Sequence, residues 1–251
     1  YTMVALADSL WYGIKDTDAD YSEAAGLYTE AMEVQTAIGD LFGLSQTVLC
    51  LAVGLECQLP APQPDAAREY LNRCIEIRRQ LGHKPGIAAA FSNLGAVCLH
   101  LGEFAEAQQH LEASLALRRE VGNVPPLILA LNSLSYVAFE AGDFDRARSA
   151  AEEASILAAA IEDDTITVQV SCGLAAVEWA QGAYPQSTDR FRRTKTFIDE
   201  IRSEHPRSLA LIAIDAFALA GADFDRERQH YQQQLRDEGA DRDLCRDAFL
   251  H

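Results

Sequence analysis

Three aspartates near the start of the chain have the spacing of a calcium-binding loop. They alternate in the stretch "DTDAD" (16–20), as the first ligands of an EF-hand do. That loop also needs a glycine at its sixth position for a sharp turn and a glutamate at its twelfth as the bidentate ligand. Tyr21 and Leu27 stand at those positions. We therefore expect a solvated loop that precedes a helix, and no calcium site.

The cysteines and histidines also lack the spacing of a metal or catalytic site. The histidines form no His-Glu-x-x-His motif, and Cys98 with His100 is interpreted as a core residue beside a helix-surface residue. Phosphate-binding glycine loops and nucleophile elbows are missing too. We expect no enzyme, no metal and no cofactor. No Cys-x-x-Cys pair occurs among the six cysteines, which we expect to be mostly buried thiols in a reducing, cytoplasmic compartment: Cys50, Cys57, Cys74, Cys98, Cys172 and Cys245.

The charge of the chain argues against nucleic acid and anionic membranes as partners. Its 38 acidic and 21 basic residues give a formal net charge of −17, and such a field repels polyanions. The densest basic runs, "IRRQ" (77–80) and "RFRR" (190–193), are short and are interpreted as solvated helix faces. No apolar run is long enough for a membrane span. The first residues do not resemble a secretory signal, and with no initial methionine we expect a piece of a larger protein.

Glycines and prolines indicate a repeat of about forty residues. Gly102, Gly142 and Gly182 are spaced by forty, and an aromatic residue follows each of them two positions later. These aromatic residues, Phe104, Phe144 and Tyr184, are expected to fill the gap between neighbouring repeats. A second glycine series closes the longer apolar-periodic segments, as helix C-termini prefer: Gly39, Gly82 and Gly122. All eight prolines fall at boundaries that this period predicts, where a helix tolerates them.

Each period contains two helical patterns, which predicts antiparallel helix pairs. In 84–123 the apolar residues recur every three or four positions, first through 86–101 and then through 104–121. The short turn around Gly102 requires the two helices to run in opposite directions. Alternation with period two is missing over any useful length, so we expect an all-α protein without a sheet.

The residues in the 84–123 copy resemble a tetratricopeptide repeat. Leu94-Gly95, Cys98, Gly102, Phe104, Ala107 and Leu111 follow the spacing of that family. The resemblance implies an α-α superhelix of about six pairs, a single solenoid over 1–239 with a capping helix or tail at 240–251. Its approximate repeats are 1–40, 41–83, 84–123, 124–164, 165–204 and 205–239. The forty-residue period resembles the repeat arrays of bacterial ATPase-linked and LuxR-like multidomain regulators.

The resemblance also implies where a partner would bind. In this family the first helix of each pair lines the concave side of the superhelix. The lining would combine amides with aromatic rings and lacks the Lys and Arg that clamp a C-terminal carboxylate. Phe139 and Trp179 have an alternative role, packing on the next pair. The expected ligand-binding residues are Asn93, Leu99, His100, Asn132, Tyr136, Phe139, Gln169 and Trp179.

These observations predict a non-catalytic module that binds a protein or peptide in the concave groove. We expect it to be the sensor or interaction arm of a larger bacterial regulatory protein. Two alternatives stay open. The groove could hold a small-molecule effector, or the apolar edges could drive self-association into a homo-oligomer.

Overall fold

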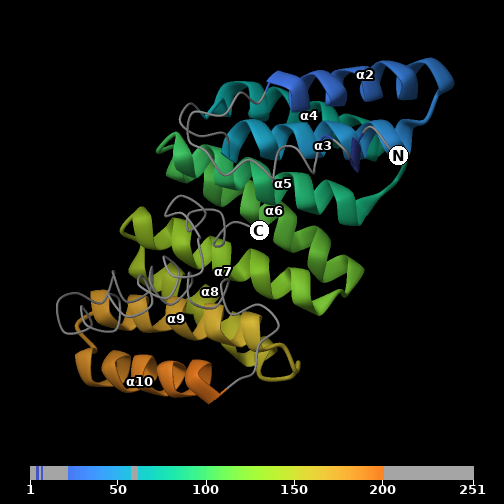
Figure 1. The fold of residues 1–251 in the computed structure, drawn as a ribbon. Helices are drawn as coiled ribbons and strands as arrows, with labels where there is room; N and C mark the ends of the chain where they lie inside the picture. The colour runs from blue at the N-terminus through green and yellow to red at the C-terminus, as the bar shows by residue number, and fades with distance from the viewer. Residues whose placement is uncertain (1–3, 6, 8–21, 58–61, 201–251) are drawn as a thin grey trace. The chain divides into compact units, whose positions relative to one another are not determined.

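The computed structural model describes residues 4, 5, 7, 22–57 and 62–200 of the chain (Figure 1). Every element in this part is an α-helix, which confirms the predicted all-α class. The aspartate run, Cys245 and the predicted segments 205–239 and 240–251 lie outside the described residues. The helices are α2 (Ser22–Ile38), α3 (Leu41–Cys57), α4 (Pro64–Gln80), α5 (Lys84–His100), α6 (Phe104–Val121), α7 (Val124–Glu140), α8 (Phe144–Ala158), α9 (Asp164–Ala180) and α10 (Tyr184–Glu200).

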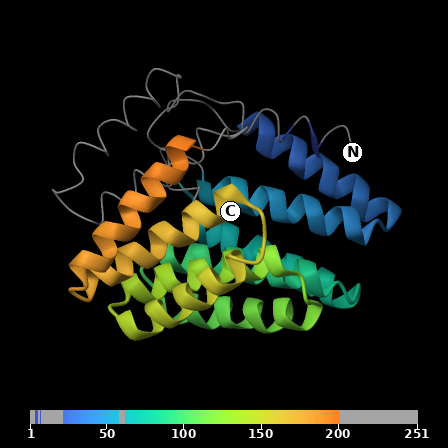
Figure 2. The same cartoon turned by 90° about the horizontal axis from the view of Figure 1, so that it is seen from below.

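The chain forms two compact units, Tyr1–Val121 and Gly122–His251. In the first unit α3 packs against α4 and α5 against α6; in the second, α7 packs against α8 and α9 against α10. Short turns join α5 to α6, α7 to α8 and α9 to α10, so these pairs are antiparallel, as α9 and α10 show in Figure 2. A continuous solenoid over 1–239 stays a prediction.

Glycine ends the helices, as the sequence predicted. Gly39, Gly82 and Gly122 have φ of 72°, 65° and 78°, a left-handed conformation that residues with a Cβ rarely adopt. At Gly102 the backbone N–H donates to the Leu99 carbonyl, and the next N–H donates to the Cys98 carbonyl. These two bonds form a Schellman motif, which satisfies carbonyls that the helix itself leaves unpaired.

Proline begins several helices, because its missing N–H and fixed φ suit the first turn. Pro85, Pro125 and Pro185 are each the second residue of a helix, as predicted. Pro64 is the first residue of α4.

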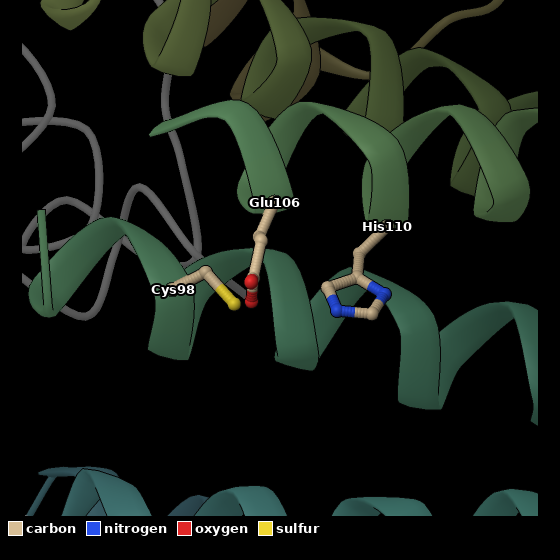
Figure 3. A group of neighbouring side chains, drawn as sticks. All are labelled: Cys98, Glu106 and His110. Atoms are coloured by element: carbon tan, nitrogen blue, oxygen red, sulfur yellow. The ribbon is translucent and has the colours of Figure 1, made fainter. Parts of the chain in front are cut away.

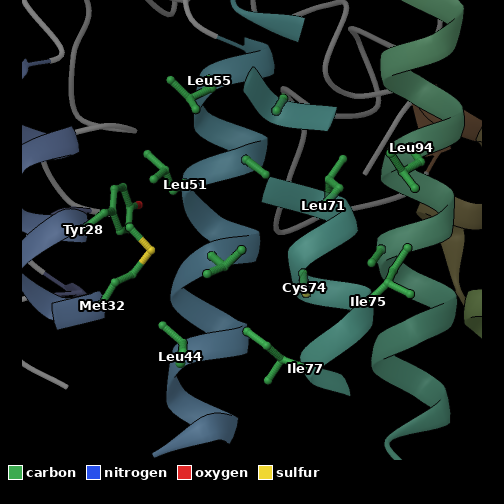
Figure 4. Close-up of a cluster of buried hydrophobic side chains, with 14 of the residues drawn as sticks. Tyr28, Met32, Leu44, Leu51, Leu55, Leu71, Cys74, Ile75, Ile77 and Leu94 are labelled. Carbon is green, nitrogen blue, oxygen red and sulfur yellow. The ribbon is translucent and has the colours of Figure 1, made fainter. Parts of the chain in front are cut away.

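The core of the first unit is a continuous apolar layer between α2, α3, α4 and α5 (Figure 4). It contains the fully buried Tyr28, Val48, Leu71 and Leu94. Cys50, Cys74, Cys98 and Cys172 form no disulfide; Cys74, Cys98 and Cys172 are buried, as expected, while Cys50 is half-buried. Burial raises the pKa of the Cys172 thiol to about 12, so it stays protonated and unreactive at neutral pH.

Small residues face each other where the two helices of a pair meet. In the α5–α6 pair, a Cβ added to Gly95 would lie 2.8 Å from Leu111 Cγ and 3.4 Å from the Ala107 carbonyl oxygen. Forty residues on, the Ser135 hydroxyl donates to the Ala147 carbonyl at 2.8 Å. In the next pair the serine is on the other helix.

There, the Ser187 hydroxyl donates to the Ala175 carbonyl at 2.7 Å. The three meeting points are therefore equivalent positions, occupied by Gly with Ala, Ser with Ala, and Ala with Ser. In each of them one helix backbone lies within reach of a side chain on its partner.

Two of the three aromatic residues after the glycine turns do not fill the gap between neighbouring pairs as expected. Phe144 and Tyr184 are exposed. Their rings contact the last turn of the preceding helix, Phe144 on Phe139 at 5.7 Å and Tyr184 on Trp179 at 4.8 Å between ring centroids. Both rings therefore close the end of their own pair, because they begin the second helix directly after a tight turn.

Arg78 is buried, which corrects the prediction of a solvated face over 77–80. Only 3% of this residue is exposed. Its guanidinium donates to the Gly86 carbonyl at 2.8 Å, to Gln46 Oε1 at 3.0 Å and to Ser45 Oγ at 3.4 Å. The hydrogen bonds join α4 to α3 and to the first turn of α5. Gly86 makes the approach possible, since a Cβ there would lie 2.6 Å from Arg78 Cδ.

Replacing Gly95 by alanine tests the close approach of α5 and α6. The added methyl group overlaps Leu111, and overpacking of this kind lowers the free energy of unfolding by about 1–3 kcal/mol. Urea denaturation measures the change. The matched control is Gly26→Ala in α2, where a Cβ meets nothing within 4 Å and alanine raises helix stability by about 0.5–1 kcal/mol. Equal effects of the two substitutions would contradict the packing.

Replacing Arg78 by alanine tests the buried network. The change removes the guanidinium donor from the Gly86 carbonyl, and loss of hydrogen bonds from a charged group lowers the free energy of unfolding by about 1.5–3 kcal/mol. Arg79→Ala is the control, because Arg79 is the exposed neighbour in the same helix turn and loses only a helix-dipole interaction of about 0.3–1 kcal/mol. If chemical denaturation gave both variants the same midpoint, the network would contribute nothing.

Candidate binding face

The first helices of neighbouring pairs lie directly against each other. α3 contacts α5 in the first unit, and α7 contacts α9 in the second, whereas the second helices of neighbouring pairs approach each other less closely. The side where the first helices meet is thus the narrower side of each stack. We use the name first-helix face for the residues of α7 and α9 on this side: Asn132, Tyr136, Gln169 and Gly173.

The eight predicted binding residues divide between the two units. In α5, Asn93 and Leu99 are half-buried and His100 is exposed. The exposure of His100 beside the buried Cys98 confirms that these two residues are surface and core. The second unit holds the other five predicted residues, on α7 and α9: Asn132, Tyr136, Phe139, Gln169 and Trp179.

Asn132 is the most enclosed amide of the first-helix face. Only 3% of the residue is exposed. Its carboxamide leans over the backbone of α9, because a Cβ built on Gly173 would lie 2.9 Å from Asn132 Oδ1. A bare glycine therefore provides the space that the amide occupies. Sequence reasoning missed this role of Gly173.

Tyr136 and Gln169 extend the polar character of the first-helix face. Tyr136 is half-buried and lies one helix turn after Asn132, on the same side of α7. Gln169 lies one turn before Gly173 on α9 and is 5% exposed. The face thus combines two amides with one amphipathic ring.

The two other predicted aromatic residues serve packing. Phe139 lies against a small apolar cluster of Ala138, Ala147 and Val177, so it touches the next pair, as its alternative role required. Trp179 contacts Tyr184 of its own pair.

An ion pair that the sequence did not reveal fixes α10 against α9. Both nitrogens of the Arg190 fork donate to the Glu178 carboxylate, at 2.8 Å and 3.0 Å. Glu178 is buried, and a bidentate pair satisfies its charge with defined geometry. The acidic residue is thereby held by α10, so Glu178 adds no unpaired charge to α9.

Comparison with known proteins agrees with this architecture. Residues 63–120, which hold α4, α5 and nearly all of α6, match the profile of the tetratricopeptide repeat family. The predicted resemblance is therefore confirmed, and the fold is an all-α helical repeat of this type. A search of curated proteins found no match.

Solved structures share the fold at low sequence identity. Aspartyl phosphate phosphatase F from Bacillus subtilis superposes with a TM-score of 0.72 at 11% identity, over 94% of this chain and 61% of that one. A signal transduction ATPase with a tetratricopeptide repeat sensor, from Pyrococcus horikoshii, gives 0.69 at 13% identity, over 98% of this chain and 38% of that one. A Rap protein complexed with competence and sporulation factor gives 0.65 at 20% identity, over 93% of this chain and 66% of that one.

Among the described residues, no helix has the length and apolar character that a membrane crossing requires.

Proposed function

We propose that this chain is a non-catalytic module that binds an extended peptide or protein segment along the first-helix face of its second unit. The observation that carries the proposal is the Asn132 amide. It is enclosed, and its Oδ1 lies over the backbone of Gly173. An amide offers one acceptor and two donors, which is the complement of a peptide backbone. Because the Asn132 amide is enclosed, a peptide that hydrogen-bonds to it would take the place of water.

Tyr136 would supply contact area beside the amide. Tyrosine is enriched among the residues that contribute most binding energy at protein interfaces, since it combines a large apolar surface with a hydroxyl group. Its half-buried ring lies one turn from Asn132, so one segment could contact both. The lack of Lys and Arg on the first-helix face favours an internal stretch of backbone over a terminal carboxylate.

We further propose that the module acts as the sensor or interaction arm of a larger regulatory protein, of bacterial origin and in the cytoplasm. The structural likeness to an ATPase that carries a tetratricopeptide repeat sensor supports this role. So does the likeness to a Rap protein complexed with competence and sporulation factor. Binding would report to the rest of the protein by favouring one arrangement of the helix pairs.

Peptides selected from a displayed library of random linear sequences test the proposal. Isothermal titration of a selected peptide should show weaker binding to Asn132→Ala, by about 2- to 10-fold for one lost hydrogen bond. Tyr136→Ala should weaken binding by about 30-fold, as truncation of a central aromatic residue does. Gly173→Ala should resemble Asn132→Ala, because the added methyl displaces the amide.

The matched control is Ile156→Ala on α8, the second helix of the same pair. Ile156 is a large apolar residue that is 73% exposed, so it reports binding to the opposite side. We expect the Ile156→Ala variant to bind the peptide with the affinity of the wild type. Unchanged affinity in both Asn132→Ala and Tyr136→Ala, with a loss in Ile156→Ala, would move the binding site to the second helices.

A further inference from the structure

Three side chains of the first unit that could bind a metal ion lie together at the end of α5 (Figure 3). Cys98 comes from α5, and Glu106 and His110 come from the first turns of α6. The cysteine sulfur, a carboxylate oxygen and an imidazole nitrogen all lie within 4.8 Å of one another. We call these residues the Cys98–Glu106–His110 cluster. They are distinct from the first-helix face, which lies in the second unit.

The repeat geometry brings the cluster together. The Gly102 turn reverses the chain, so the first turns of α6 return along the last turns of α5. Glu106 and His110 are four residues apart and share one side of α6. Phe91 of α5 stacks on the His110 ring, with 5.9 Å between centroids and 22° between planes. This stacking fixes the imidazole on the side that faces Cys98.

The histidine is in the state that a metal ion requires. Burial lowers the pKa of His110 below its ordinary value, and Arg68 lowers it further, against an opposing effect of Glu106. The imidazole is therefore neutral at pH 7, with a lone pair for a ligand bond. Burial raises the pKa of the Cys98 thiol to about 11, so binding a metal ion there must release the thiol proton to water.

Arg68 of α4 is the cation that would compete with a metal ion. It forms a close ion pair with Glu103, whereas its distance to the Glu106 carboxylate is 3.8 Å. The nearer partner thus leaves Glu106 only loosely engaged. Glu106 is exposed and can rotate toward the sulfur without disturbing the core.

We propose that the Cys98–Glu106–His110 cluster binds Zn²⁺ or a divalent transition metal of similar preference, through one sulfur, one nitrogen and one oxygen. This donor set suits zinc, whereas magnesium and calcium prefer oxygen alone. Zinc bonds of about 2.3 Å to sulfur and about 2.0–2.2 Å to nitrogen and oxygen place tetrahedral ligands about 3.5 Å apart. The sulfur, nitrogen and oxygen atoms, which lie within 4.8 Å of one another, therefore need to approach each other by about 1 Å. Three protein ligands leave the fourth position for water or a partner's side chain.

The proposal differs from the sequence expectation of no metal. That expectation considered Cys98 with His100, two residues on the same helix. The signal that could have found the cluster was the Glu106–His110 spacing, read together with the turn that brings Cys98 beside it.

Cobalt titration of the purified chain tests the metal site. Co²⁺ should bind one per chain with a thiolate-to-metal charge-transfer band, and Zn²⁺ should displace it. Proton release on Zn²⁺ binding, measured in weak buffer, should approach one per metal ion. Cys98→Ala should abolish the charge-transfer band. His110→Gln should lower the affinity by more than about 100-fold, since changes outside the ligand shell alone lower it by 10- to 100-fold.

The control is Cys74→Ala, which removes another buried thiol of the same unit and should leave cobalt binding unchanged. Circular dichroism checks that each variant folds. If Cys98→Ala unfolds, His110→Gln still tests the site, because His110 is only half-buried. Cobalt binding without a thiolate band would overturn the proposal. So would an affinity that His110→Gln does not change, or a band that disappears in Cys74→Ala. Peptide binding plays no part in this test.

Discussion

The helix pair is held together at a point where one backbone comes within reach of its partner's side chain. Gly95 lies under Leu111, and Ser135 and Ser187 donate to carbonyls across their pairs. A larger residue at such a point separates two helices over their whole length, because each helix is rigid. The other contacts of a pair, including the contact between two aromatic rings at its end, require the two helices to be this close.

Glycine also determines what lies between helices of neighbouring pairs. In the second unit α7 meets α9 at a glycine, and the space above Gly173 is filled by the Asn132 amide. In the first unit Arg78 occupies the space beside Gly86. Glycine therefore has two functions in this chain. With positive φ it ends helices, and inside helices it gives space to a polar side chain from a neighbour.

Much of the fold could be predicted from the sequence, since glycine and proline act locally. A left-handed φ at Gly82 or a proline at the second position of α5 depends on few neighbours. The burial of Arg78 could not be predicted, because its acceptors come from α3 and α5, whose approach depends on Gly86. The site was predictable only in part. The periodic register placed Asn132 and Tyr136 on one side of the helix. The position of the Asn132 amide over Gly173 and the contacts of Phe139 and Trp179 depend on the tertiary structure.

The alternation of serine between the two helices at the meeting points makes each pair a matched set. In one pair the serine, Ser135, is on the first helix and the alanine is on the second. In the following pair the alanine is on the first helix and Ser187 is on the second. Exchanging single helices between these repeats would bring serine against serine, or alanine against alanine. The unit that duplication or recombination can move intact is therefore the whole hairpin, with its boundary in the turn before a first helix.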